Sequence, residues 1–153
     1  MQSRVPQVLD YLTKGYSCCQ AMLATYGDIH GLDRETALKL GSGMGGGVGH
    51  TGGVCGLVNG ACLVLGLKHG HTDELYGANL KVTKLKEVQI CREFCDELTA
   101  KFGSIACIDI IKRDIRTLEA TVKAFEENAL QICGEYAQFA AELLENKYNI
   151  LTK

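Results

Sequence analysis

Residues 41–70 read GSGMGGGVGHTGGVCGLVNGACLVLGLKHG, and this stretch decides how the rest of the chain can fold. Twelve of the 18 glycines lie in it, and no Asp, Glu, Lys or Arg occurs between Gly41 and Leu67. Within a helix or strand each glycine costs roughly 0.5–1 kcal/mol relative to Ala, so this density indicates tight turns or backbones in close contact. Cys55 and Cys62 are seven residues apart, so on one helix they would face the same way.

The second half of the stretch, residues 54–67, is apolar apart from one Asn and its glycines. Fourteen residues of helix rise about 21 Å, which is short of the roughly 30 Å hydrocarbon core of a membrane. We therefore expect a buried core helix that starts at Thr51 or Gly53. Gly56 and Gly60 form a small-xxx-small pair, which would let another helix approach closely.

Length and charge narrow the class of protein. A chain of 153 residues is long enough to bury its own core, so we expect one domain over residues 1–153. A net charge of -2 and a pI near 6.1 argue against a nucleic-acid-binding or membrane-surface protein, either of which would need a basic face. The first fifteen residues, MQSRVPQVLDYLTKG, do not resemble a signal peptide, and we expect a cytoplasmic location.

Capping residues and apolar spacing predict helices along the whole chain, whereas strand signals are nearly absent. Ser17 and Gln20 have the spacing of a capping box, and Asp33 and Ser104 are further N-cap candidates. We therefore expect an all-α single-domain bundle of about six to eight helices packed around the glycine-rich turn and its helix. The expected helices cover about residues 3–15, 17–27, 33–40, 51–67, 74–102, 104–115 and 132–144, and residues 112–128 could be a linker or a helix.

Eight cysteines without a secretory signal are not expected to form a disulfide framework, because the cytosol keeps thiols reduced. About half of them could be small core residues. Cys18, Cys19, Cys55 and Cys107 fall in the first turn of an expected helix, where the helix dipole stabilises a thiolate. A thiolate is both a nucleophile and a metal ligand, so these positions favour reactivity or metal binding.

The remaining candidates have simpler interpretations. Cys91 and Cys95, spaced i and i+4, could bind a soft metal or form a disulfide, but they lie on an apolar helical stripe, and core packing is the preferred interpretation. Cys62, inside an apolar helix, is also expected in the core. His50, in the glycine-rich turn, could be a base or a ligand but is more typical of a solvated loop residue. No Cys-x-x-Cys pair occurs, which argues against thioredoxin-type, ferredoxin-type and zinc-finger sites.

Several segments together resemble a known family. They are YSCCQA at residues 16–21, GGGVG at 45–49, GVCGLVNGA at 53–61, FGSIAC at 102–107, and Cys133. In this order they resemble the C-GCAxxG-C-C family of redox-active cysteine proteins. The resemblance implies that Cys18, Cys55, Cys107 and Cys133 are the family cysteines, with Cys19, Cys62, Cys91 and Cys95 additional to the pattern. Leu57 departs from the motif, which has Ala at this position.

Three hypotheses follow for the four cysteines implied by the resemblance. In the first, they are redox-active thiols, with Cys18 and Cys55 as one pair and Cys107 and Cys133 as another, serving a redox partner of unknown identity. In the second, the same four cysteines bind a metal ion or an iron–sulfur cluster. The second hypothesis thus implies one of these cofactors, whereas the disulfide hypothesis implies none. In the third, the chain is a structural bundle that forms homo-oligomers through its glycine-rich face. The sequence leaves open whether the protein is an enzyme.

Overall fold

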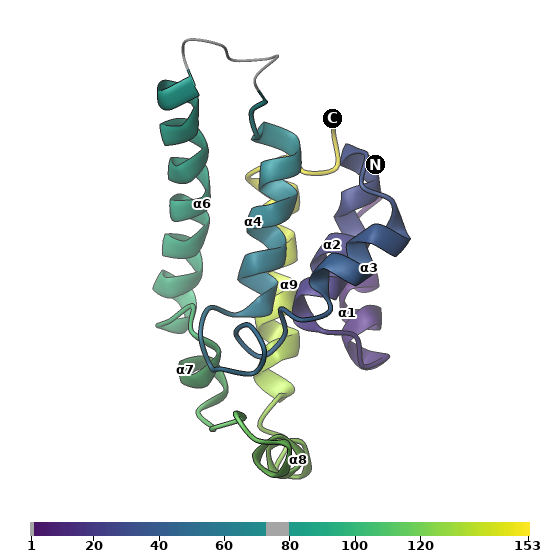
Figure 1. Ribbon diagram of the computed structural model, residues 1–153, viewed down its shortest axis with the longest axis vertical. Coiled ribbons are helices and arrows are strands. Elements are labelled where there is room, and N and C mark those ends of the chain that lie inside the picture. Colours follow the sequence, from purple (N-terminus) through teal and green to yellow (C-terminus); the bar gives the residue numbers. More distant parts are fainter. Residues whose placement is uncertain (1, 73–79) are drawn as a thin grey trace.

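The computed structural model describes residues 2–72 and 80–153, and their regular structure is helical, which confirms the all-α prediction (Figure 1). The strand-like pairing found within these residues is a single antiparallel bridge between Val54 and Ala106. The helices, in chain order, are α1 (Val5–Thr13), α2 (Cys18–Tyr26), the 3-10 helix η1 (Gly27–His30), α3 (Arg34–Gly41), α4 (Gly56–His69), α6 (Leu80–Phe102), α7 (Cys107–Ile111), α8 (Leu118–Glu126) and α9 (Gln131–Asn146).

Two predicted N-caps are confirmed. The Ser17 hydroxyl accepts a hydrogen bond from the Gln20 amide (3.2 Å), and the Gln20 side chain accepts one from the Ser17 amide (2.9 Å), which completes the capping box. The Asp33 carboxylate accepts a hydrogen bond from the Thr36 amide at the start of α3. The Ser17 hydroxyl also donates to the Gly41 carbonyl (2.8 Å), so the same residue joins the start of α2 to the end of α3.

Two helices start later than predicted. α4 begins at Gly56, after Cys55, because the Cys55 amide donates to the Ile105 carbonyl (2.8 Å) and holds the chain extended there. α7 begins at Cys107 and not after Ser104, because the Ser104 hydroxyl donates to the Asp109 carboxylate and accepts from the Ala106 amide before the helix starts. Cys107 is therefore the first residue of its helix.

The helix expected over residues 74–102 is seen as α6, and the first part of that prediction, residues 74–79, lies outside the described residues. Phe94 and Leu98 on the predicted apolar stripe are fully buried, whereas Leu85 is 69% exposed and Val88 is 43% exposed. The stripe therefore packs only in the second half of α6. Residues 112–128 contain α8, whose first turn is capped by the Thr117 hydroxyl.

The centre of the bundle is the contact between α2 and α4. A Cβ added to Gly60 would lie 2.7 Å from the Cβ of Met22, and one added to Gly56 would lie 2.9 Å from the Cβ of Cys18. The predicted close approach therefore takes place inside the chain. α2 therefore covers Gly56 and Gly60, whereas Gly43 and Gly49 in the glycine-rich turn have open space around them, and the homo-oligomer hypothesis stays a prediction.

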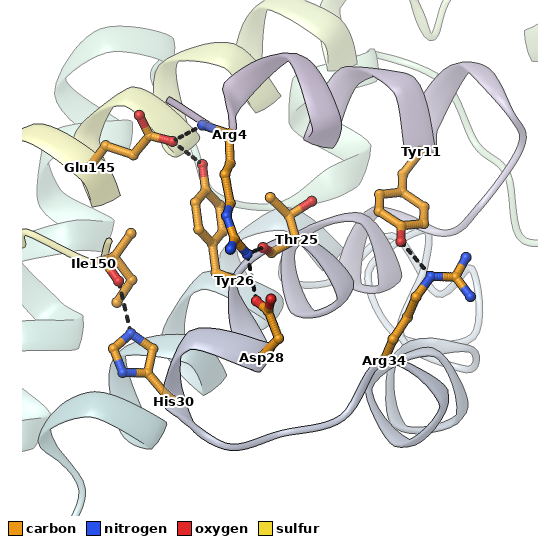
Figure 2. Close-up of polar contacts among 9 residues, drawn as sticks. All are labelled: Arg4, Tyr11, Thr25, Tyr26, Asp28, His30, Arg34, Glu145 and Ile150. Atoms are coloured by element: carbon orange, nitrogen blue, oxygen red, sulfur yellow. Dashed lines mark hydrogen bonds and ion pairs between the residues drawn. The ribbon is translucent and has the colours of Figure 1, made fainter. Parts of the chain in front are cut away.

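A network of polar contacts joins the start of the chain to α9 (Figure 2). The Glu145 carboxylate accepts hydrogen bonds from the Arg4 amide (2.8 Å) and from the Tyr26 hydroxyl (2.9 Å). The Arg4 guanidinium in turn donates to the Thr25 carbonyl and to Asp28. These contacts hold α1, α2 and α9 together on the side of α2 away from its first turn.

No helix among the described residues combines the length and the apolar character needed to cross a membrane.

Candidate functional site: a thiol cluster at the start of α4

The loop before α4 and the segment before α7 run side by side and bring two cysteines together. The Cys55 amide donates to the Ile105 carbonyl (2.8 Å), and the Cys107 amide donates to the Gly53 carbonyl (2.7 Å). These two hydrogen bonds flank the bridge between Val54 and Ala106. The backbone therefore fixes the relative position of Cys55 and Cys107.

A hydrogen bond between thiols links α2 to the same site. Cys18, the first residue of α2, donates to the Cys55 sulfur, and this bond together with burial raises the pKa of Cys18 well above its ordinary value. Gly56 permits the approach, because its missing Cβ would lie 2.9 Å from the Cβ of Cys18. The Cys18 thiol is therefore the one of the two that retains its proton.

Cys55 is the acceptor, and its pKa moves the other way. The hydrogen bond from Cys18 lowers the pKa of Cys55, burial opposes this, and the backbone amides of Leu57 and Val58 in the first turn of α4 add to the lowering. Cys55 is only 5% exposed, so its thiolate would be shielded from water. Within this cluster, Cys55 is the sulfur best suited to carry negative charge.

Cys107 and Cys133 complete the cluster. Burial raises the pKa of Cys107 to about 11 and that of Cys133 to about 12, and in both cases Cys55 adds to the effect. Cys133, on α9, packs against a small apolar group that contains Cys107. The structure thus brings together all four cysteines that the resemblance implied, from α2, the loop before α4, α7 and α9.

The prediction of stabilised thiolates in first helical turns is wrong for three of the four positions. The pKa of Cys18 and of Cys107 is raised, and burial raises the pKa of Cys19 to about 11. For Cys19 and Cys107 the main reason is burial, which outweighs the favourable field of a helix N-terminus, whereas for Cys18 it is the hydrogen bond with Cys55, followed by burial. Cys19 is fully buried in the core, with the side chains of α2 and α4 around it.

His50 lies on the surface. Its imidazole Nδ1 is 3.3 Å from the Thr121 hydroxyl of α8, and the side chain is exposed. This agrees with the preferred interpretation of a solvated loop residue. The alternative interpretation of His50 as a base or a ligand finds no support in this contact.

Sequence reasoning missed a second thiol cluster. Cys62 on α4 is hydrogen-bonded to Cys91 and to Cys95 on α6, and all three are half-buried. All three also pack against the hydrophobic core, as the core-packing interpretation predicts, but the contact of Cys62 with the two α6 cysteines was not predicted. The expectation that Cys55 and Cys62 face the same way was wrong, because Cys55 precedes the helix and has an extended backbone. The signal available in the sequence was the i, i+4 spacing of Cys91 and Cys95.

All eight cysteines are free thiols. Among the residues that the structure describes, no group of three or more His, Cys, Asp or Glu side chains is arranged to hold a metal ion. The arrangement at the start of α4 is therefore one thiol donor, one sulfur acceptor of lowered pKa and two further thiols beside them. Such an arrangement can carry out thiol–disulfide chemistry.

Residues 16–147 match the model of the family described as "Putative redox-active protein (C_GCAxxG_C_C)", and the chain belongs to this family. No curated protein and no solved structure matches the chain. The motif segment here is CGLVNG, from Cys55 to Gly60. Its two glycines are those that allow α2 to approach, and Leu57, the departure from the motif, is fully buried in the core without displacing Cys18 from Cys55.

Proposed function

We propose that the protein is a thiol–disulfide redox protein in which Cys55 is the nucleophile and Cys18 is its partner. Membership of a redox-active family supports the general class. The observation that carries the proposal is the hydrogen bond from the Cys18 thiol to the Cys55 sulfur, which lowers the pKa of one thiol and raises that of the other. A pair of this kind separates an attacking thiolate from a proton-bearing second thiol.

The reaction can be written with its electrons balanced. The Cys55 thiolate attacks one sulfur of a small disulfide, RSSR, which forms a mixed disulfide Cys55–S–S–R and releases RS⁻. The Cys18 thiol then gives its proton to RS⁻ and attacks the Cys55 sulfur, which forms the Cys18–Cys55 disulfide and releases a second RS⁻. Two protein thiols are thereby oxidised by two electrons, and one external disulfide is reduced to two thiols.

Cys107 and Cys133 would act as a second pair beside the first. Both are close enough to Cys55 for its charge to raise their pKa values, and they pack together at the α7 and α9 end of the cluster. A Cys18–Cys55 disulfide could therefore exchange with them. Cys107 and Cys133 would lose two electrons and form a disulfide, while Cys18 and Cys55 would regain their thiols.

Burial restricts the external reactant. Cys55 is 5% exposed and Cys107 is 8% exposed, so a large folded disulfide partner could not reach either sulfur without local opening. The chemistry at this site therefore favours a small disulfide of low molecular weight.

The test starts from protein purified without oxygen. Metal content and the visible spectrum are recorded, and free thiols are counted before and after treatment with oxidised glutathione. We expect a colourless protein that loses thiols in pairs, with Cys18 and Cys55 found in one disulfide by peptide mapping. The variants Cys18→Ala and Cys55→Ala should each abolish this disulfide, and Cys19→Ala, which removes a neighbouring thiol with a raised pKa, should retain it.

The same preparation separates the competing hypotheses. Iron or another metal bound in proportion to protein, and lost in Cys55→Ala, would replace the disulfide proposal with the metal or iron–sulfur hypothesis. If all thiols stayed reduced after treatment with oxidised glutathione, in folded and metal-free protein, the disulfide and metal hypotheses would both be contradicted. A structural role would then remain.

A further inference from the structure

Cys62 on α4 lies at the same height along the helix pair as Cys91 and Cys95 on α6. The two helices run side by side in opposite directions (Figure 1). A Cβ added to Gly66 would lie 3.6 Å from the Glu87 carboxylate, and one added to Gly70 would lie 3.4 Å from it. Glu87 therefore lies opposite the last turn of α4. Because the helices are antiparallel, Cys62, one turn earlier on α4, falls opposite the turn of α6 between Cys91 and Cys95.

The direction of helical side chains selects one of the two possible partners. Side chains lean toward the N-terminus of their own helix. In this antiparallel pair, Cys62 therefore leans toward the level of Cys95, and Cys95 leans toward the level of Cys62. Cys91 leans away, toward Glu87. Cys62 is hydrogen-bonded to both α6 cysteines, so neither pairing requires the helices to move far.

The cluster lies at the edge of the core and is open to small molecules. Cys62, Cys91 and Cys95 are half-buried, in contrast to Cys55 in the first cluster. Beneath them, Phe94 is fully buried, whereas Leu63, next to Cys62, is 46% exposed. One side of the cluster is therefore fixed by packing and the other faces solvent.

We propose that Cys62 and Cys95 form a second redox-active dithiol, which hydroperoxides oxidise to a disulfide between α4 and α6. Hydrogen bonding with Cys62 lowers the pKa of Cys95 to about 7 and also lowers the pKa of Cys91, so the α6 sulfurs are the ones suited to carry negative charge. The pKa of Cys62 is raised by its hydrogen bonds to Cys91 and Cys95, so Cys62 retains its proton. A partly exposed thiol of low pKa beside a second thiol is the usual arrangement of a peroxide-sensitive cysteine.

The proposed step balances with a hydroperoxide, R′OOH, as the oxidant. The Cys95 thiolate attacks the terminal oxygen, the O–O bond breaks, and R′O⁻ leaves and is protonated to the alcohol. The resulting Cys95 sulfenic acid is then attacked by the Cys62 sulfur, which forms the S–S bond and releases water with the Cys62 proton. Two thiols lose two electrons, and the hydroperoxide becomes an alcohol and water.

The test treats the reduced full-length protein with hydrogen peroxide, blocks remaining thiols with iodoacetamide, and maps disulfides without reduction. Trypsin cleaves after Arg92 and so separates Cys91 from Cys95, and chymotrypsin cleaves after Leu57 and separates Cys55 from Cys62. We expect a peptide cross-linked through Cys62 and Cys95 in the wild-type protein. Cys62→Ala and Cys95→Ala should each abolish it, and Cys91→Ala should still form it.

The assignment does not depend on the proposed role of the first cluster. Cys55→Ala, which removes the nucleophile of that cluster, should leave the cross-link between Cys62 and Cys95 in place. A disulfide from Cys62 to Cys91 or to Cys55 would overturn the proposal. Oxidation of Cys95 to the sulfinic acid, with Cys62 still open to alkylation, would also overturn the proposal. Circular dichroism of the same wild-type sample must show that its helices are intact.

Discussion

The two thiol clusters use the same hydrogen-bond pattern at different depths. In each, a thiol of raised pKa is hydrogen-bonded to sulfur of lowered pKa: Cys18 to Cys55 in one, and Cys62 to Cys91 and Cys95 in the other. Cys55, the sulfur of lowered pKa in the first cluster, is 5% exposed, whereas Cys91 and Cys95 are half-buried, as is Cys18. Hydrogen bonding thus determines which sulfur is reactive, and burial determines which reactants can reach it.

A buried tyrosine lies near both clusters. Burial raises the pKa of Tyr136 on α9, and both Cys55 and Cys95 add to this rise, so the phenol lies within electrostatic reach of each. Its hydroxyl donates to the Ser104 carbonyl (3.3 Å), and its ring packs against Phe102 with centroids 4.6 Å apart. We expect the two thiol pairs to react independently, because Cys55 and Cys95 are each hydrogen-bonded to a thiol of their own cluster.

The largest expected effect is that a substitution in one thiol cluster abolishes disulfide formation there and leaves the other cluster able to oxidise. Cys55→Ala should abolish oxidation of Cys18 by oxidised glutathione, because Cys18 then has no partner of lowered pKa. Cys62→Ala should leave the Cys18–Cys55 disulfide unchanged. Site-resolved alkylation followed by mass spectrometry measures both. If Cys62→Ala also protected Cys18 and Cys55 from oxidation, the two clusters would be coupled and the comparison would be wrong.

The next effect concerns the rate at which Cys95 reacts. Because Cys62 donates to Cys95 and lowers its pKa to about 7, removal of the donor in Cys62→Ala should raise that pKa. The thiolate fraction rises with pH, so a higher pKa means less thiolate at pH 7, and we expect roughly a tenfold slower alkylation by iodoacetamide. The wild-type rate should reach half its maximum near pH 7, and the variant only at higher pH. An unchanged midpoint would contradict the claim that the hydrogen bond with Cys62 lowers the pKa of Cys95.

A smaller effect contrasts the two sides of α4. Gly60→Ala places a Cβ 2.7 Å from the Cβ of Met22, on the side of the buried cluster, so we expect a loss of about 1–3 kcal/mol of stability. Gly66→Ala, on the same helix, meets only the Glu87 carboxylate at 3.6 Å. Because Ala favours helix over Gly, we expect a gain of up to about 1 kcal/mol. Urea unfolding measures both, and equal losses would contradict the difference in packing.

The smallest effect is electrostatic. Asp96, exposed on α6, raises the pKa of Cys95 through its charge. Asp96→Asn removes that charge, so the midpoint of Cys95 alkylation should fall by roughly a few tenths of a pH unit at low salt. The difference between variant and wild type should shrink as salt is added, because an exposed charge is screened. A rise in the midpoint would contradict the assigned direction.

Local signals in the sequence predicted the fold well. The capping box at Ser17 and the cap at Asp33 depend on residues three apart, and both are confirmed. The close approach at Gly56 and Gly60 was also predicted, because glycines four residues apart leave room on one face of a helix for the backbone of another. The late start of α4 was not predicted, since it depends on a hydrogen bond to Ile105, fifty residues along the chain.

The candidate site was predictable in part. The family motifs pointed to Cys18, Cys55, Cys107 and Cys133, and the structure places these four in one cluster. Their individual pKa directions were not predictable, because a rule about helix N-termini omits burial. The cluster of Cys62, Cys91 and Cys95 was missed for a different reason: its members lie on two helices whose relative register no local pattern determines.

The measurement that tests the central claim most directly is a redox titration followed at every cysteine. The protein is equilibrated in glutathione buffers of increasing potential, and each thiol is quantified by isotopic alkylation and mass spectrometry. We predict that Cys18 and Cys55 lose reactivity together in a single two-electron transition, while Cys19 stays reduced. Oxidation of Cys18 and Cys55 at separate potentials, or a Cys55 that pairs only with glutathione, would contradict the assignment of these two cysteines as the redox pair.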